Sequence, residues 1–228
     1  LSETWFRPAG DEPDMAEMTP PGYTLKSVPR LTGRGGGLAI VYRSSLTDAV
    51  IILSGTKELS FDSFEVCELR LILHNQSYTF LSIYRPPHSL KNKTTDKMFV
   101  DEFVDFVEPF MVRESLFVVG DYNLHFDDPS KPYVKAMLTS LQNIGLEQLV
   151  RVPTHRLGHT IDWVVTNRPD TVNNLTVEDK AISDHYCIFF ELQLEKNGTK
   201  KRSVESRHLK KIDRAAFRDD VSQAAVAV

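Results

Sequence analysis

The feature that most constrains the fold is a short apolar run that stops at a glycine and is followed by an acid and an amide, Leu116-Phe117-Val118-Val119-Gly120-Asp121-Tyr122-Asn123. Four consecutive apolar residues favour a strand buried on both faces, and Gly120 allows a sharp turn or the close approach of a ligand. Asp121 and Asn123 lie on the same side if the backbone stays extended. The run therefore predicts a buried sheet with polar groups at one edge, where enzymes commonly build their sites.

Length and composition limit the classes of protein that the chain can belong to. Its 228 residues, 41% apolar and 25% charged, predict one large globular domain with a tail. No run of about 18 apolar residues exists and no signal peptide is visible, so we expect an intracellular protein without a membrane span. A net charge of −4 argues against a broad cationic surface. Cys67 and Cys187 lie in apolar runs and are expected to be reduced and buried.

Hydrophobic periodicity predicts sheets covered by helices. Apolar residues at three- and four-residue steps indicate helices over Asp96–Val112 and Pro132–Ile144. Runs rich in β-branched and aromatic residues predict a hairpin, Phe64–Leu73 with Tyr78–Tyr84, and strands at Leu38–Tyr42, Ile161–Thr166, Leu175–Val177 and Tyr186–Leu192. Residues 7–36 are rich in Pro, Gly and acids and are expected to form a surface loop, and the chain after Glu195 a polar, partly basic tail. This pattern is typical of an α/β or α+β layered domain.

Polar groups at strand ends form a short set of candidates for chemistry. A charged residue inside a buried run is rarely unpaired, so Asp162 needs a partner, which is a backbone donor, an arginine or His185. The carboxylates and the amide suit Mg²⁺, whereas the cysteines and histidines lack zinc spacing, and no nucleophilic serine or cysteine with its own base is evident. The set supports metal-assisted attack by water. Its members are Glu3, Tyr84, Asp121, Asn123, Asp162, Asp184 and His185.

Five motifs, taken in order, resemble the endonuclease/exonuclease/phosphatase family. They are Leu1-Ser2-Glu3-Thr4-Trp5, Ser82-Ile83-Tyr84-Arg85-Pro86-Pro87, Gly120-Asp121-Tyr122-Asn123, Ile161-Asp162-Trp163-Val164 and Ser183-Asp184-His185. Within that family the chain looks most like the endonuclease domain of non-LTR (LINE-type) retrotransposons. The resemblance implies a deoxyribonuclease-I-like fold, a four-layered sandwich of two packed mixed β-sheets flanked by helices, over residues 1–194. It also implies that residues 195–228 are a linker toward a reverse transcriptase.

The resemblance also implies roles for the candidate residues. Glu3 would bind Mg²⁺, or Mn²⁺ in its place, and Asp184 would be a carboxylate for a second metal or in the second shell. Tyr84 would contact the scissile phosphate, and Asp121 would hold and deprotonate the attacking water. Asn123 would orient the water or the phosphate. His185 would stabilise the transition state, and Asp162 would hold His185 in position. Thr154 and Arg85 would bind the substrate.

The function implied is that of a Mg²⁺-dependent endonuclease that nicks double-stranded DNA in the nucleus and leaves a 3′-hydroxyl to prime reverse transcription. An abasic-site nuclease or a phosphoinositide or sphingolipid phosphatase shares the same catalytic set. The resemblance implies a first strand, before the Glu3 motif, that carries an Asn. Because this chain starts at Leu1, we expect a sheet lacking one strand, reduced stability, and weak or absent nicking. An inactive truncated or domesticated copy that binds nucleic acid is the non-enzymatic alternative.

Overall fold

The computed structural model describes residues 1–30, 35–54, 61–87, 94–112, 115–194 and 213–225. Their elements, in chain order, are α1 (Glu12–Glu17), β1 (Tyr23–Val28), β2 (Leu38–Arg43), the 3₁₀ helix η1 (Ser44–Ala49), β3 (Val50–Ser54), β4 (Glu65–Leu73), β5 (Gln76–Tyr84), α2 (Asp96–Val107), the 3₁₀ helix η3 (Glu108–Val112), β6 (Ser115–Asp121), α3 (Pro132–Asn143), β7 (Glu147–Gln148), β8 (Asp162–Thr166), the 3₁₀ helix η4 (Pro169–Thr171), β9 (Val172–Glu178), β10 (Cys187–Leu192) and α4 (Arg214–Ala225). Among the described residues, none of the helices has the length and apolar character that a membrane span requires.

A six-stranded mixed sheet forms the centre of the fold, with strand order β3-β4-β5-β6-β8-β7. The neighbours β5 and β6 are parallel, and α2 lies between them in the chain, as a parallel pair requires a crossover connection. The predicted hairpin is confirmed as β4 and β5, joined by His74 and Asn75, which both have positive φ. The predicted buried strand is confirmed as β6.

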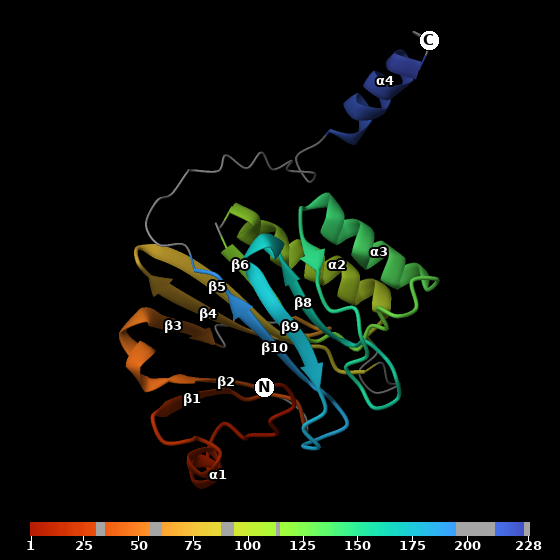
Figure 1. The fold of residues 1–228 in the computed structure, drawn as a ribbon. Helices are drawn as coiled ribbons and strands as arrows, with labels where there is room; N and C mark the ends of the chain where they lie inside the picture. The colour runs from red at the N-terminus through yellow and green to blue at the C-terminus, as the bar shows by residue number, and fades with distance from the viewer. Residues whose placement is uncertain (31–34, 55–60, 88–93, 113–114, 195–212, 226–228) are drawn as a thin grey trace.

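Two predicted helices cover one face of this sheet. Thr95 caps α2 by accepting a hydrogen bond from the backbone N–H of Met98. The aromatic stripe of α2 packs with α3 and with the sheet in the main core, and Figure 1 shows both helices on that side. The α-helix ends before Val112, the predicted end, and continues as η3, because Pro109 has no N–H to donate within an α-helix.

The opposite face of the sheet carries the second layer. Val66 belongs to the main core, whereas its neighbour Cys67 packs with Leu38 of β2 and with Tyr84, because successive strand residues point to opposite faces. In Figure 1 the β1–β2 and β9–β10 pairs lie on this side. The predicted α/β fold of packed sheets with flanking helices is confirmed, and its second sheet consists, in the described residues, of two separate antiparallel pairs.

The N-terminal segment and the tail are among the parts of the chain that differ from the sequence prediction. Residues 7–36 were expected to be a surface loop, but they contain α1 and β1. Every residue of β1 is exposed or only half-buried, so its apolar pattern is weak, and its conformation follows from pairing with β2 along its whole length. In the tail, residues 195–212 lie outside the described residues, and α4 occupies most of the remainder.

Candidate active site

Three of the predicted residues stand in one row across three neighbouring strands. Asp121 in β6 is the register partner of Tyr84 in β5 and of Asp162 in β8. Directly opposed residues point to the same face of a sheet with Cβ atoms about 5 Å apart. The row lies on the face of the second layer, because Tyr84 packs with Leu38 of β2. Residues far apart in sequence are thus gathered by strand register.

Gly120 makes this register possible. A Cβ at Gly120 would lie 1.9 Å from the carbonyl oxygen of Ile83, its partner in β5. The glycine also has a φ of 143°, which side-chain-bearing residues rarely adopt. The sequence prediction allowed a sharp turn or the close approach of a ligand, whereas the structure shows the close approach of β5.

Asn123 reaches Asp121 through a bent backbone. Its φ of 44° is left-handed, so the backbone does not stay extended, which was the condition for placing Asp121 and Asn123 on the same side. The backbone N–H of Asn123 donates to Asp121 Oδ1 and its side-chain amide donates to Asp121 Oδ2, both at 2.9 Å. The same amide nitrogen lies 2.7 Å from the carbonyl oxygen of Arg85, to which it also donates. Asn123 therefore holds the Asp121 carboxylate in one orientation.

Arg85 is placed differently from its predicted role. Its side chain is 1% exposed and donates to the carbonyl oxygens of Tyr122 and Asn123 and to the carboxylate of Asp96. The guanidinium also lies over the Phe99 ring, 4.8 Å from its centroid. The prediction that Arg85 binds substrate is corrected, because its charge is directed into the protein. It positions the chain segment that carries Asn123.

Glu3 joins the site through Tyr84. The Tyr84 hydroxyl donates a hydrogen bond to Glu3 Oε1, and Glu3 adopts a φ of 53°. Burial, and then the hydrogen bond to the Glu3 carboxylate, raise the pKa of Tyr84 well above its usual range. The tyrosine is therefore a neutral donor at this edge of the site.

Asp162 and His185 form the predicted pair. His185 Nδ1 lies 2.9 Å from Asp162 Oδ2 and 3.1 Å from Oδ1. The hydrogen bond to the Asp162 carboxylate raises the pKa of His185 from 6.5 to about 9, so the imidazole is protonated at neutral pH. Of the partners that the sequence left open for Asp162, the structure selects His185.

The pKa of the Asp121 carboxyl is strongly raised. Asp121 is only 4% exposed. Burial, and then the charge of Asp162, raise the pKa of Asp121 from 3.8 to about 7, although the Asn123 N–H opposes the shift. A carboxylate with a pKa near neutrality is suited to accept a proton during a reaction at that pH.

Asp184 lies on the outer side of His185. Its side chain is 62% exposed, and its Oδ2 lies 3.3 Å from Nε2 of His155. His155 pairs with His185 in an isolated β-bridge, and their ring centroids are 5.0 Å apart. The contacts run from Glu3 through Tyr84, Asp121, Asp162 and His185 to Asp184. The two carboxylates predicted to bind metal, Glu3 and Asp184, therefore lie at opposite ends of the site. Sequence reasoning missed His155, which no spacing to the other motifs marks.

Thr154 supports the site from within. It is fully buried, and its hydroxyl oxygen accepts the backbone N–H groups of Ile161 and Asp162 at 3.1 and 3.0 Å. Its carbonyl oxygen accepts the N–H of Tyr186 at 2.7 Å. The predicted contact with substrate is corrected, because the hydroxyl is enclosed by the chain that it positions.

The fold and the geometry of the site together define the class, an α/β sandwich of the deoxyribonuclease-I-like type. No family model matches the sequence, and no curated protein matches it either. Solved structures do match. The endonuclease domain of TRAS1, a telomere-specific non-LTR retrotransposon, is 17% identical with a TM-score of 0.58, over 77% of this chain and 82% of that one.

Two further solved structures share the fold. The 3′ phosphatase NExo from Neisseria, bound to a product DNA hairpin, is 16% identical with a TM-score of 0.61, over 85% of this chain and 88% of that one. A protein of the endonuclease/exonuclease/phosphatase family from Leptotrichia buccalis is 13% identical with a TM-score of 0.54, over 83% and 81%. The chain therefore has the fold of endonuclease/exonuclease/phosphatase proteins.

Proposed function

We propose that the chain is a divalent-metal-dependent endonuclease that hydrolyses a phosphodiester in double-stranded DNA. The observation that carries this proposal is the row of Tyr84, Asp121 and Asp162, with the protonated His185 at one end and Glu3 at the other. It combines a base of near-neutral pKa, a cationic donor and oxygen ligands in one place.

The residues present fit Mg²⁺, with Mn²⁺ as a substitute. Hard cations prefer carboxylate oxygens, and Glu3 and the Asp121–Asp162 pair supply them. Repulsion between the Asp121 and Asp162 carboxylates is the kind of charge crowding that a cation relieves. We assign Glu3 to the ion, and Asp184 to a second ion or its water. When bound, the ion supplies charge neutralisation at the phosphoryl oxygens.

The other side chains of the site have separate roles in the proposed reaction. Asp121 takes the proton of the attacking water, and two hydrogen bonds from Asn123 hold the Asp121 carboxylate in place. His185 donates to a phosphate oxygen on which negative charge develops, and Asp162 keeps that imidazole charged and oriented. Tyr84 gives a neutral hydroxyl to the phosphate beside Glu3.

The biological setting is the wider part of the proposal. The TRAS1 domain belongs to a retrotransposon and NExo was solved with a DNA hairpin, which supports DNA as the substrate. In this setting residues 1–194 form the endonuclease and residues 195–228 lead toward a reverse transcriptase. The enzyme would act in the nucleus and leave a 3′-hydroxyl for priming.

Nicking of supercoiled plasmid with Mg²⁺ tests the proposal. We expect nicks with the unaltered chain, none with Asp121→Ala, and an unchanged rate with Asp48→Ala, an exposed acid of η1. Extension of the nicks by a DNA polymerase reports the 3′-hydroxyl. Release of phosphate from a 3′-phosphorylated hairpin without nicking would instead make the chain a phosphatase, and neither activity would contradict a catalytic role.

A further inference from the structure

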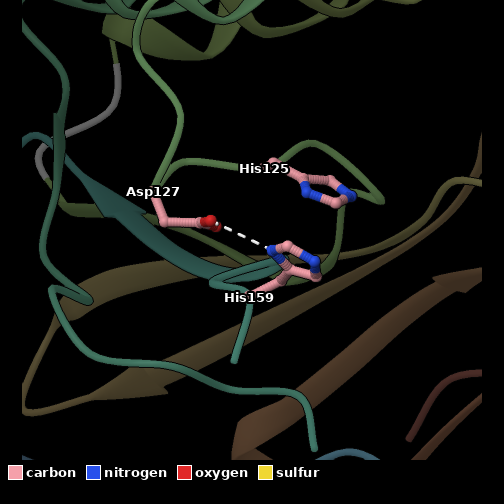
Figure 2. A group of neighbouring side chains, drawn as sticks. All are labelled: His125, Asp127 and His159. Carbon is pink, nitrogen blue, oxygen red and sulfur yellow. Dashed lines mark hydrogen bonds and ion pairs between the residues drawn. The ribbon is translucent and has the colours of Figure 1, made fainter. Parts of the chain in front are cut away.

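A second group of metal-ligating side chains lies in two loops outside the candidate active site. His125 and Asp127 belong to the loop between β6 and α3, and His159 belongs to the loop that precedes β8. One ligand atom from each residue lies within 4.8 Å of the other two. Figure 2 shows the three side chains directed toward one another, and the group shares no residue with the two clusters that contain His185.

Contacts already hold these side chains together. The imidazole rings of His125 and His159 have centroids 4.1 Å apart. Asp127 Oδ2 lies 3.0 Å from His159 Nδ1, and Asp127 Oδ1 accepts the backbone N–H of Thr160 at 2.8 Å. The adjacent backbone N–H of Phe126 donates to the carbonyl oxygen of Thr160 at 3.0 Å. The two loops are therefore fixed against each other where the three residues meet.

We propose that His125, Asp127 and His159 form a binding site for a divalent transition-metal ion of the zinc type. Two imidazoles and one carboxylate suit Zn²⁺ rather than Mg²⁺, and three protein ligands leave one tetrahedral position for water. Tetrahedral ligands at Zn–N and Zn–O lengths lie about 3.3 Å apart, near the separation of His159 Nδ1 and Asp127 Oδ2.

The ligand atoms of this group are accessible from solvent. The side chains of His159 and Asp127 are 38% and 33% exposed, so an ion can reach them from solvent.

An ion here would brace the loop that supports the active site. The carbonyl oxygen of His159 accepts the backbone N–H groups of Thr154 and His155 at 2.9 and 3.0 Å. Thr154 in turn holds the backbone N–H of Asp162. The site is thus joined to the row of carboxylates through a short series of hydrogen bonds, but its ligands are its own.

Binding of Zn²⁺ and Co²⁺ to the metal-stripped chain tests the proposal. In calorimetry we expect one Zn²⁺ in addition to any bound at the active-site carboxylates, together with a visible absorption band of tetrahedral Co²⁺ and a midpoint of thermal unfolding that rises by several degrees with added Zn²⁺. His125→Asn and His159→Asn should each weaken Zn²⁺ binding, raising the dissociation constant by at least about tenfold. His74→Asn, at the β4–β5 turn, and His185→Asn, in the active site, should leave it unchanged.

Circular dichroism of each variant shows whether it is folded. Unchanged affinity in the folded His125→Asn and His159→Asn variants would overturn the proposal. So would loss of the Co²⁺ band in His185→Asn, which would place the ion in the active site, or no Zn²⁺ binding by the unaltered chain at millimolar concentration. The last result would leave the three residues as an ion pair with a packed imidazole. None of these readouts depends on nuclease activity.

Discussion

Asp121 and Asp162 are direct cross-strand partners at the ends of β6 and β8, so two carboxylates face each other on a sheet surface that is largely shielded from water. Opposed like charges destabilise a sheet. The row that supports the proposed reaction therefore lowers the stability of the metal-free protein, and this can be measured.

Asp121→Asn should make the metal-free protein more stable at pH 8. The pKa of Asp121 is about 7 in the folded state against 3.8, so its contribution to stability is present below pH 3.8 and is lost as the pH rises through 7. At pH 8 the ionised carboxylate costs on the order of a few kcal/mol. Urea unfolding in EDTA should show a larger free energy of unfolding for Asp121→Asn than for the unaltered chain at pH 8, and the difference should shrink toward pH 4. Equal stabilities at pH 8 would contradict it, and Asp48→Asn is the exposed control.

Asp162→Asn should lower the pKa of His185 from about 9 toward 6.5. The hydrogen bond to the Asp162 carboxylate is the largest cause of the raised pKa, burial opposes it, and the charges of Asp121 and Asp184 raise it by less. The stabilising contribution of the pair is complete below pH 6.5 and is lost as the pH rises through 9. NMR titration of the imidazole measures the shift. An unchanged titration in Asp162→Asn, or an equal change in Asp170→Asn, would show that the pair does not set the pKa.

Gly120→Ala should destabilise the domain by about 3 kcal/mol or more, the upper range of overpacking. The new methyl would lie 1.9 Å from the Ile83 carbonyl oxygen, which belongs to a neighbouring strand. Gly145→Ala is the matched control, because Gly145 also has positive φ but nothing lies within 4 Å of an added Cβ. It should cost only about 1–2 kcal/mol of backbone strain. Similar losses for the two variants, in urea unfolding, would refute the steric argument.

Arg85→Met should lower kcat for nicking and leave KM for DNA unchanged. Its guanidinium holds the carbonyl oxygens of Tyr122 and Asn123 rather than facing substrate, so its loss misplaces Asn123. Loss of its ion pair with Asp96, whose side chain is 31% exposed, should also lower the stability of the domain. Steady-state kinetics beside exposed Arg43→Met provide the comparison. A rise in KM with unchanged kcat would restore a substrate-binding role.

Local pattern was sufficient for several of the main elements. The helix over Asp96 onward, the hairpin of β4 and β5, and the buried strand β6 follow from hydrophobic period and β propensity, which act over a few neighbouring residues. The pattern failed for β1, because this strand buries too little to show alternation and is defined by its partner β2.

The sequence by itself determined which residue types are available for chemistry and placed Asp121, Asn123, Asp162 and His185 at strand ends. Only the tertiary structure decided how they meet, since strand register sets Tyr84, Asp121 and Asp162 in one row. It also decided which polar groups face inward: Arg85 and Thr154 are enclosed, whereas His125, Asp127 and His159 converge from two loops. The physical reason is that burial and proximity depend on long-range packing, and spacing along one chain does not contain that information.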